Sequence, residues 1–305
     1  MTKNKKKSVR KPLKELTLMD RFLFDEAMSK PMISRTILSI LLEEEISPIH
    51  IGMTEKTQEP YYDSRAVRLD LLAFDENDVV YDAEAQKKNT GRRNLKRRSR
   101  LYQSHIDVNL MEPGDLNFKN MNDTYVIFIA PFDLFGMKKY KYTFRMSCDE
   151  VLGMPLDDGA VRIFLNTHGE NEDEVSTELV ELLHYMENPL WNNNNFQNDR
   201  VRELANQVER LKESQEVGVK YMRLWEEMVE LKQEAIAEGR AEGRAEGRAE
   251  GRAEGRAEGR AEGIASKTVE DIKMIMKNLN LTYEKAVDVL EIPEDEREKY
   301  KVLIE

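Results

Sequence analysis

The sequence is poor in the residues that build zinc sites and disulfide frameworks. It has one cysteine, Cys148, and four histidines among 305 residues. A single cysteine excludes a network of intrachain disulfides and argues against a cysteine-based zinc site. The histidines are scattered, and no two of them stand at the spacing of metal ligands. A site for a soft or borderline metal is therefore not expected.

Long apolar runs are also missing. No stretch reaches the roughly 18 apolar residues that a membrane-spanning helix needs. The basic N-terminus is not followed by an apolar run, so it does not have the form of a secretory signal. These absences predict a cytoplasmic protein with no membrane contact.

Charge is abundant but uneven along the chain. Charged residues make up 34% of the sequence and the formal net charge is −11, which by itself argues against a nucleic-acid partner. Two segments reverse the sign, because residues 1–14 and 87–100 hold no acid. Their basic residues are Lys3, Lys5, Lys6, Lys7, Arg10, Lys11 and Lys14, and Lys87, Lys88, Arg92, Arg93, Lys96, Arg97, Arg98 and Arg100. The second segment predicts a basic helix over residues 90–109 that contacts DNA phosphates; a plain solvated face is the alternative.

Acidic residues stand beside this basic segment, on two strand-like stretches at 66–74 and 79–86. Asp70 lies on the first, and Glu84 and Gln86 lie on the second. Residues two apart on a strand point to the same face, so Glu84 and Gln86 share a face that Asp70 can join. Two carboxylates and an amide suit a hard cation such as Mg²⁺, with Asp70 and Glu84 as metal ligands. Ordinary surface acids on an exposed strand edge are the alternative interpretation.

A shared metal site requires one particular strand register. Directly opposed residues of an antiparallel pair point to the same face, and the residue numbers of every opposed pair add up to the same sum. Asp70 and Glu84 have even numbers, so they share a face only if that sum is even. Asp75 opposite Val79, across a three-residue loop, gives the sum 154 and sets Asp70 against Glu84. In that register their carboxylates are expected to come within roughly 4–5 Å of each other.

The remaining periodicity predicts alternating helices and strands. Helical spacing covers residues 20–45 and 175–186, and strands are expected at 49–51, 125–131, 140–146 and 161–165. Residues 125–131 are continuously apolar, as in a strand covered on both faces. This alternation predicts an α/β sandwich with a mixed central sheet.

Several of these segments carry a family resemblance. The acids with Gln86, and the segments 18–24, 98–104, 125–129, 142–145 and 159–166, resemble the Rpn family of recombination-promoting nucleases within the PD-(D/E)XK superfamily. The resemblance implies a restriction-endonuclease-like core over residues 15–190, with Asp70, Glu84 and Gln86 as catalytic residues. Gln86 stands where most of the superfamily has a lysine, which places a neutral group where a charge is usual.

The resemblance implies a function as well. It implies a Mg²⁺-dependent endodeoxyribonuclease, with Mn²⁺ as the alternative ion, associated with recombination and transposition of mobile elements. Lys87, Arg92, Arg93, Lys96, Arg97 and Arg98 are then the expected DNA contacts. A second interpretation stays open, in which a weak or inactive nuclease fold acts as a DNA-binding or oligomeric module.

The rest of the chain predicts appendages to the core. Residues 1–14 form a basic arm, either a solubilising tail or a source of further phosphate contacts. Residues 196–236 have helical spacing, residues 237–263 repeat Ala-Glu-Gly-Arg, and residues 264–305 return to short helices. Glycine costs about 0.8–1 kcal/mol relative to alanine in a helix, so the repeat is either a helix that persists when packed or a flexible spacer. Homo-oligomerisation through this long C-terminal helical extension is the expected assembly.

Overall fold

The computed structural model describes residues 10–53, 57–58, 67–68, 72–89, 91–111, 117–188 and 196–304. It divides into two compact units, Met1–Trp225 and Glu226–Glu305.

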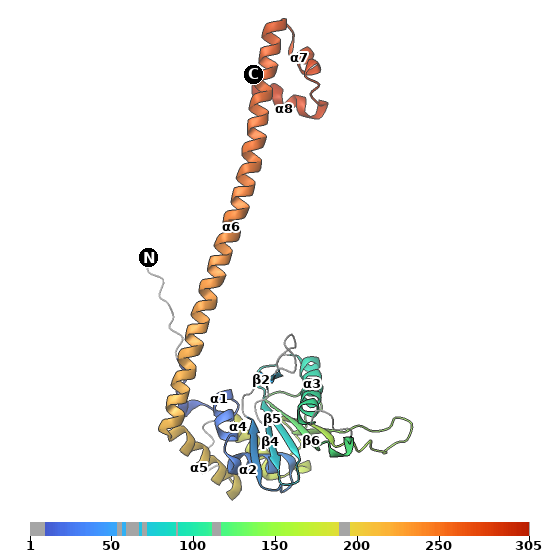
Figure 1. Ribbon diagram of the computed structural model, residues 1–305, viewed down its shortest axis with the longest axis vertical. Helices are drawn as coiled ribbons and strands as arrows, with labels where there is room; N and C mark the ends of the chain where they lie inside the picture. The colour runs from blue at the N-terminus through green and yellow to red at the C-terminus, as the bar shows by residue number, and fades with distance from the viewer. Residues whose placement is uncertain are drawn as a thin grey trace. The chain divides into compact units, whose positions relative to one another are not determined.

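A mixed six-stranded sheet forms the centre of the first unit (Figure 1), in the order β1-β4-β5-β6-β8-β7. Its strands are β1 (Ile49–Met53), β4 (Leu72–Asp75), β5 (Val80–Ala85), β6 (Thr124–Ala130), β7 (Lys141–Phe144) and β8 (Ala160–Asn166). β1, β4 and β5 are antiparallel, β5, β6 and β8 are parallel, and β7 is an antiparallel edge. β6 is central and almost wholly buried, as its continuous apolar sequence predicts.

Helices cover both faces of this sheet (Figure 1). One face packs against α1 (Arg21–Met28), α2 (Pro31–Leu42), α4 (Thr177–Glu187) and α5 (Asp199–Glu213), and the other packs against α3 (Arg92–Leu110). Short 3₁₀ helices occur at Leu13–Glu15, Phe118–Asn120 and Glu172–Glu174. Two separate apolar cores result, one on each face. The predicted α/β sandwich with a mixed central sheet is confirmed.

Local sequence explains where several helices begin and end. Pro31 opens α2, where its missing N–H costs nothing, and Glu43 ends that helix in the left-handed region at φ 62°. The side chains of Ser176 and Asn198 cap the N-termini of α4 and α5 by accepting backbone hydrogen bonds. These caps fix the helices that support the sheet from the side opposite α3.

The predicted register between β4 and β5 is confirmed. Leu72 pairs with Asp82 and Phe74 with Val80, so each pair sums to 154. The loop is built by Asp75, whose Oδ1 accepts hydrogen bonds from the backbone N–H groups of Asn77 and Val79. Asp78 then takes φ 58°, the left-handed residue of a three-residue hairpin loop.

The stretch predicted as one strand at 66–74 divides between two sheets. β3 (Val67–Arg68) pairs with β2 (Thr57–Gln58) in a separate two-stranded sheet, and β4 belongs to the main sheet. Asp70 lies between them and falls outside the described residues. The expected approach of Asp70 and Glu84 therefore stays a prediction.

The Ala-Glu-Gly-Arg repeat is helical. It lies within α6 (Gln215–Leu279), a continuous helix of 65 residues, and its side chains are exposed throughout residues 237–263. In the second unit, α7 (Tyr283–Val289) and α8 (Glu294–Ile304) pack with the end of α6 around Ile272, Val287 and Tyr300. Across the described residues, no helix combines the length and the apolar character needed to cross a membrane.

Candidate active site

Three polar side chains line one face of β5 and of the residue that follows it, within an otherwise apolar part of the sheet. Asp82, Glu84 and Gln86 alternate along the chain and share the face covered by α3. Their exposures are 0%, 4% and 8%, so all three are buried. Two carboxylates buried two residues apart repel each other and need a nearby cation.

Arg98 of α3 is the cation beside these residues. Its guanidinium makes an ion pair with Glu84 Oε1 through Nη2. Nη1 donates to Gln86 Oε1 at 2.9 Å, and Nε donates to the Tyr102 hydroxyl at 2.7 Å. A planar fork with fixed donors suits a cluster of three acceptors better than a lysine would. Arg98 thus joins β5 to its own helix through three polar contacts.

Charge and burial shift the pKa values of this cluster. Burial alone would lower the pKa of Arg98, but the Glu84 carboxylate and the Tyr102 oxygen outweigh it, and the pKa is raised. Burial, then the charge of Glu84, also raises the pKa of Tyr102. Arg98 is therefore a permanent cation here, and Tyr102 stays a neutral hydroxyl at neutral pH.

Gln86 uses both ends of its amide within the protein. Its Oε1 accepts from Arg98, and its Nε2 donates to the backbone carbonyl of Lys88 at 2.5 Å. This arrangement fixes the amide across the end of β5. Gln86 therefore holds Arg98 in place, and both its amide oxygen and its amide nitrogen already have hydrogen-bond partners within the protein.

The expected DNA contacts separate into different environments. Arg93, Lys96 and Arg97 are exposed on α3, whereas Arg98 is half-buried against β5. Lys87 extends from the end of β5 to Asp20, with 2.5 Å between Nζ and Oδ1. The side chain of Arg92 lies outside the described residues.

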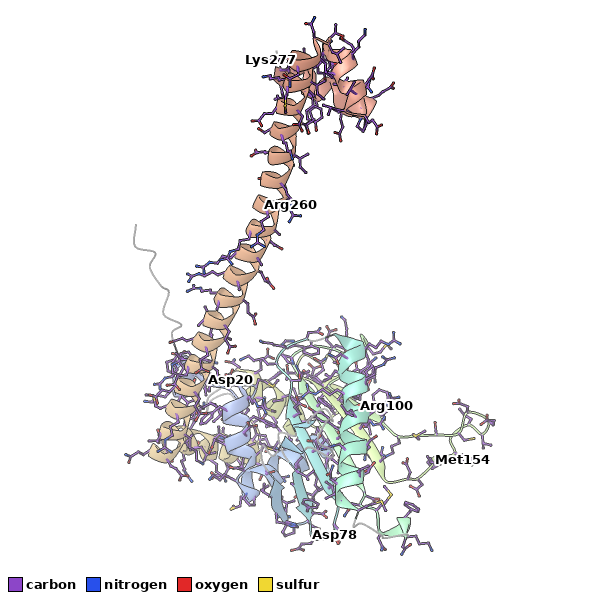
Figure 2. The ribbon with its side chains drawn as sticks, turned by 45° about the horizontal axis from the view of Figure 1, so that its top comes forward. Asp20, Asp78, Arg100, Met154, Arg260 and Lys277 are labelled. Carbon is purple, nitrogen blue, oxygen red and sulfur yellow. The ribbon has the colours of Figure 1, made fainter. Side chains whose placement is uncertain are left out.

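Helical geometry explains this separation. At 100° per residue, Arg98 and Lys96 project from opposite flanks of α3, because they lie about 160° apart around the helix axis. Arg93, Arg97 and Arg100 lie on the outward surface between these flanks, and all three are exposed. Figure 2 shows Arg100 on the side of α3 that faces away from the sheet. The basic run therefore supplies one inward cation and an outward basic surface.

The donor set fits a hard divalent cation. Mg²⁺ binds through one or two carboxylates and retains several waters, and β5 offers carboxylate and amide oxygens on one face. Among the residues that the structure describes, no cluster of three or more His, Cys, Asp or Glu side chains is arranged as a metal site. A complete site on this face would therefore draw on a further ligand such as Asp70.

Two members of the cluster were missed by the sequence argument. Asp82 stands two residues before Glu84, so its period-2 spacing already put it on the same face. Tyr102 stands four residues after Arg98, so it lies on the same side of α3. Leu95, Arg98 and Tyr102 are spaced three and four apart, which indicates that Arg98 lies beside the buried side of α3. The spacing of Arg98 relative to these two residues could therefore have predicted that this arginine points toward the sheet.

Comparison with known proteins gives one finding. A family model described as PD-(D/E)XK nuclease family transposase matches residues 21–235. No curated protein and no solved structure matches the chain. The matched segment contains the whole sheet, α3 and the buried polar cluster.

Proposed function

Since the chain belongs to the PD-(D/E)XK nuclease family transposases, we propose that it is a metal-dependent endonuclease that hydrolyses phosphodiester bonds in DNA. The observation that supports this most directly is the buried carboxylate of Glu84, which lies on the central sheet beside a basic helix. We further propose that the reaction accompanies recombination or transposition of mobile elements, as the family description suggests.

Asp70 and Glu84 are the proposed ligands of Mg²⁺, or of Mn²⁺. The register of β4 and β5 supports this assignment, because its even sum, if continued by two residues, sets Asp70 opposite Glu84. When bound, such an ion polarises the phosphate and lowers the pKa of a coordinated water. The remaining task of the protein's side chains is to orient the phosphate and to offset its negative charge.

Arg98 is proposed to supply the positive charge that Gln86 lacks. A neutral amide cannot offset the charge that develops on a phosphate, whereas a guanidinium can. Gln86 holds Arg98 by its amide oxygen, and Tyr102 holds it by the hydroxyl. In this proposal Gln86 and Tyr102 are positioning residues for Arg98, and Arg98 is positioned to meet the phosphate.

The outward surface of α3 is the proposed DNA contact. Arg92, Arg93, Lys96 and Arg97 would bind phosphates without reading sequence. Lys87, whose Nζ reaches Asp20 beyond the end of β5, is a further proposed phosphate contact outside this surface. Such contacts release counterions and give binding a steep dependence on salt. Association of two copies through α6 is a further proposal for the assembly that cuts both strands.

Plasmid nicking by the purified full-length chain tests the proposed reaction. Cleavage should require Mg²⁺ or Mn²⁺ and should fall at least about 100-fold in Glu84→Gln and in Asp70→Asn. Glu76→Gln, which changes an exposed acid in the loop between β4 and β5, is the matched control and should cleave normally. Full activity in Glu84→Gln would remove the proposed site.

A non-catalytic role is the second candidate. The ion pair between Arg98 and Glu84 occupies a carboxylate oxygen that a metal would use, and Gln86 replaces the usual lysine. A protein of this kind would bind DNA or assemble through α6 without cutting. Salt-dependent DNA binding with no nicking in either metal would favour it over the nuclease.

A further inference from the structure

A cavity of about 170 Å³ lies on the flank of α3 opposite the Glu84 cluster. Its walls are Phe135, Phe144 and Phe164, and its polar groups come from Lys96, Ser99 and Arg162. Phe135 follows β6, and Phe144 and Phe164 lie on β7 and β8, so the cavity opens on the sheet face that α3 covers. It is separate from the buried polar cluster on β5.

The aromatic walls form an ordered group. The ring of Phe135 lies 4.8 Å from that of Phe144 and 5.4 Å from that of Phe164, between ring centroids. Asp133 fixes the loop that carries Phe135, because its Oδ1 accepts from the backbone N–H of Phe135 at 2.8 Å and from the Tyr142 hydroxyl at 2.9 Å. Phe144 nevertheless leaves 43% of its surface exposed. The site thus offers an aromatic ring that is partly open to solvent.

Two of the three polar residues of this cavity, Lys96 and Arg162, are cations. Lys96 Nζ lies 4.1 Å from the centroid of Phe135. Arg162 Nε is buried and finds no hydrogen-bond acceptor within the part of the chain that the structure describes. Arg162 and Lys96 nevertheless both line the cavity and bring two cationic groups to it. Aromatic faces beside two cations therefore suit a flat ring that carries acceptors.

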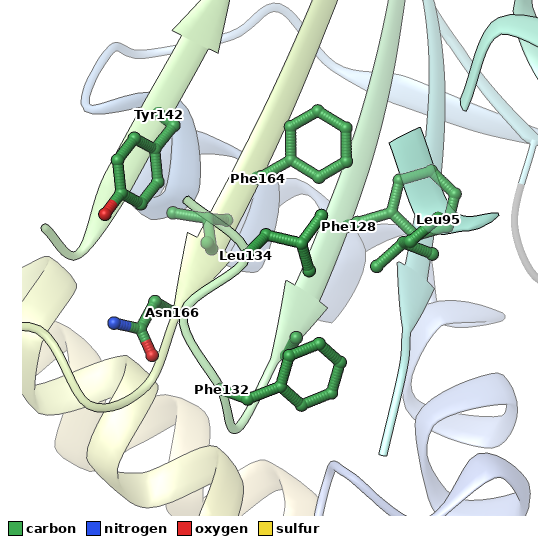
Figure 3. A pocket seen from close by; sticks show the side chains of 9 residues that line it. Leu95, Phe128, Phe132, Leu134, Tyr142, Phe164 and Asn166 are labelled. Atoms are coloured by element: carbon green, nitrogen blue, oxygen red, sulfur yellow. The ribbon is translucent and has the colours of Figure 1, made fainter. Parts of the chain in front are cut away.

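Size restricts the ligand further. A cavity of about 150 Å³ is enough for one benzene ring, so about 170 Å³ admits one ring of similar size. The adjoining cavity on the same face, lined by Leu95, Phe128 and Phe164, measures only about 10 Å³ and holds no more than a water (Figure 3). Phe164 is shared by both cavities and closes the inner end of the larger one.

The sheet relates this cavity to Glu84. Glu84 pairs with Phe128, and Phe128 pairs with Phe164, so the three lie in one row across β5, β6 and β8. Two strand spacings set Glu84 and Phe164 roughly 10 Å apart, about three base steps of B-DNA. The outward basic surface of α3, with Arg93 and Arg97, lies between the two flanks.

We propose that this cavity binds an unpaired nucleobase of the DNA strand that crosses α3, by stacking on Phe135 and Phe144 and accepting hydrogen bonds from Arg162 or Lys96. The inference rests on the proposed function, because it takes DNA as the substrate, and it adds which form of DNA is preferred. A paired base cannot enter a pocket of one ring, so the preferred substrate has a single-stranded segment or an extruded base near the cut.

Binding of two matched probes, measured without divalent metal, tests the proposal. One probe is a fluorescein-labelled single strand of thymine bases, each of which is a single ring, and the other is the blunt duplex of that strand with its complement. The full-length chain should bind the single strand more tightly than the duplex, as measured by fluorescence anisotropy. Phe144→Ala and Arg162→Met should weaken single-strand binding about tenfold, while duplex binding changes less than about twofold.

Matched controls distinguish stacking in the cavity from the non-specific effect of losing any exposed phenylalanine or arginine. Phe118→Ala removes an exposed phenylalanine outside the cavity, and Arg145→Met removes an exposed arginine one residue beyond β7. Both should leave the ratio of the two affinities unchanged. Equal losses for the two probes in Phe144→Ala and Arg162→Met, or no preference of the parent chain for the single strand, would overturn the nucleobase site.

Nicking in Mg²⁺ is measured in parallel, so that failure of the nucleobase site can be distinguished from failure of the nuclease proposal. Normal nicking with no preference for the single strand overturns the nucleobase site and leaves the nuclease standing. Binding of the single strand with the expected losses but no nicking supports the site and removes the reaction. Absence of binding to both probes overturns both.

Discussion

At the scale of single residues, the sequence predicted a face but not the contacts on it. The spacing of Glu84 and Gln86 predicted that they point the same way, and the structure places both beneath α3. The role of Arg98 could not be read from charge alone, because the run around it is uniformly basic. Which arginine turns inward depends on how α3 packs on β5, and tertiary packing decides that.

Replacing Arg98 should separate metal binding from cleavage. In Arg98→Gln a cation beside Glu84 is lost, so Mn²⁺ should bind about tenfold more tightly, as Coulomb repulsion of that size predicts. Cleavage should fall about 100-fold, because the charge next to the phosphate is missing. Mn²⁺ affinity from electron paramagnetic resonance and the nicking rate measure the two effects. The control is Arg100→Gln, which changes an exposed arginine of the same helix. Weaker metal binding together with slower cleavage would indicate a merely structural role.

Gln86 and Arg98 should be coupled energetically. Gln86→Lys alone sets an ammonium against the guanidinium of Arg98, which now lies 2.9 Å from the amide oxygen. Cleavage by this variant should drop. Gln86→Lys combined with Arg98→Gln keeps one cation and should cleave faster than either single variant. A double-mutant cycle of nicking rates measures the coupling; additive losses would show that the two residues act independently.

Asp20 should control stability in acid. Burial would raise the pKa of Asp20, but hydrogen bonds from Lys11 and Lys87 outweigh burial and lower it to about 2. Because the folded pKa lies below the unfolded value, the stabilisation is complete above about pH 4 and is lost as pH falls towards 2. Asp20→Asn should cost about 1 kcal/mol at pH 7 and less at pH 3. Urea unfolding at both pH values checks this, and an equal loss at the two pH values would contradict it.

At the scale of elements, periodicity located most of the fold. The apolar run at β6 and the helix α4 were both predicted from local patterns. The loop between β4 and β5 was predicted from an even-sum register, and Asp75 and Asp78 provide its turn. The small sheet of β2 and β3 was not predicted, because two-residue strands leave no periodic pattern to detect.

The outward surface of α3 should determine the salt dependence of DNA binding. Each phosphate contact contributes about 0.9 to the slope of log affinity against log salt concentration. Arg93→Ala with Arg97→Ala should therefore lower that slope by about 2 for every DNA sequence. Fluorescence anisotropy over a range of salt concentrations gives the slope. Lys119→Ala serves as the contrasting variant, because it removes an exposed lysine outside α3. An equal decrease of the slope there would show that the surface of α3 is not the DNA contact.

At the scale of the whole molecule, the long helix α6 presents an unexplained apolar series. Tyr221, Leu224, Met228 and Leu231 are spaced by three, four and three residues, the pattern of a coiled-coil seam. Leu224, Met228 and Leu231 are 38%, 47% and 64% exposed. The repeat that follows contains seven glycines, which cost a helix roughly 6 kcal/mol in total relative to alanine. An exposed helix with this composition gains stability when a second helix covers its apolar side.

The full-length chain should therefore form a dimer through α6. Leu224→Glu with Leu231→Glu places charges in the seam and should dissociate the dimer, which sedimentation velocity detects. Gln233→Glu introduces the same charge on the opposite side of the helix, so it should leave the dimer intact. Amide exchange at residues 237–263 should quicken in the dissociated variant, because the glycine-rich helix then lacks its partner, while exchange within β6 stays slow. A monomeric parent chain with slow exchange in the repeat would contradict the prediction, since the helix would then be stable alone despite its glycines.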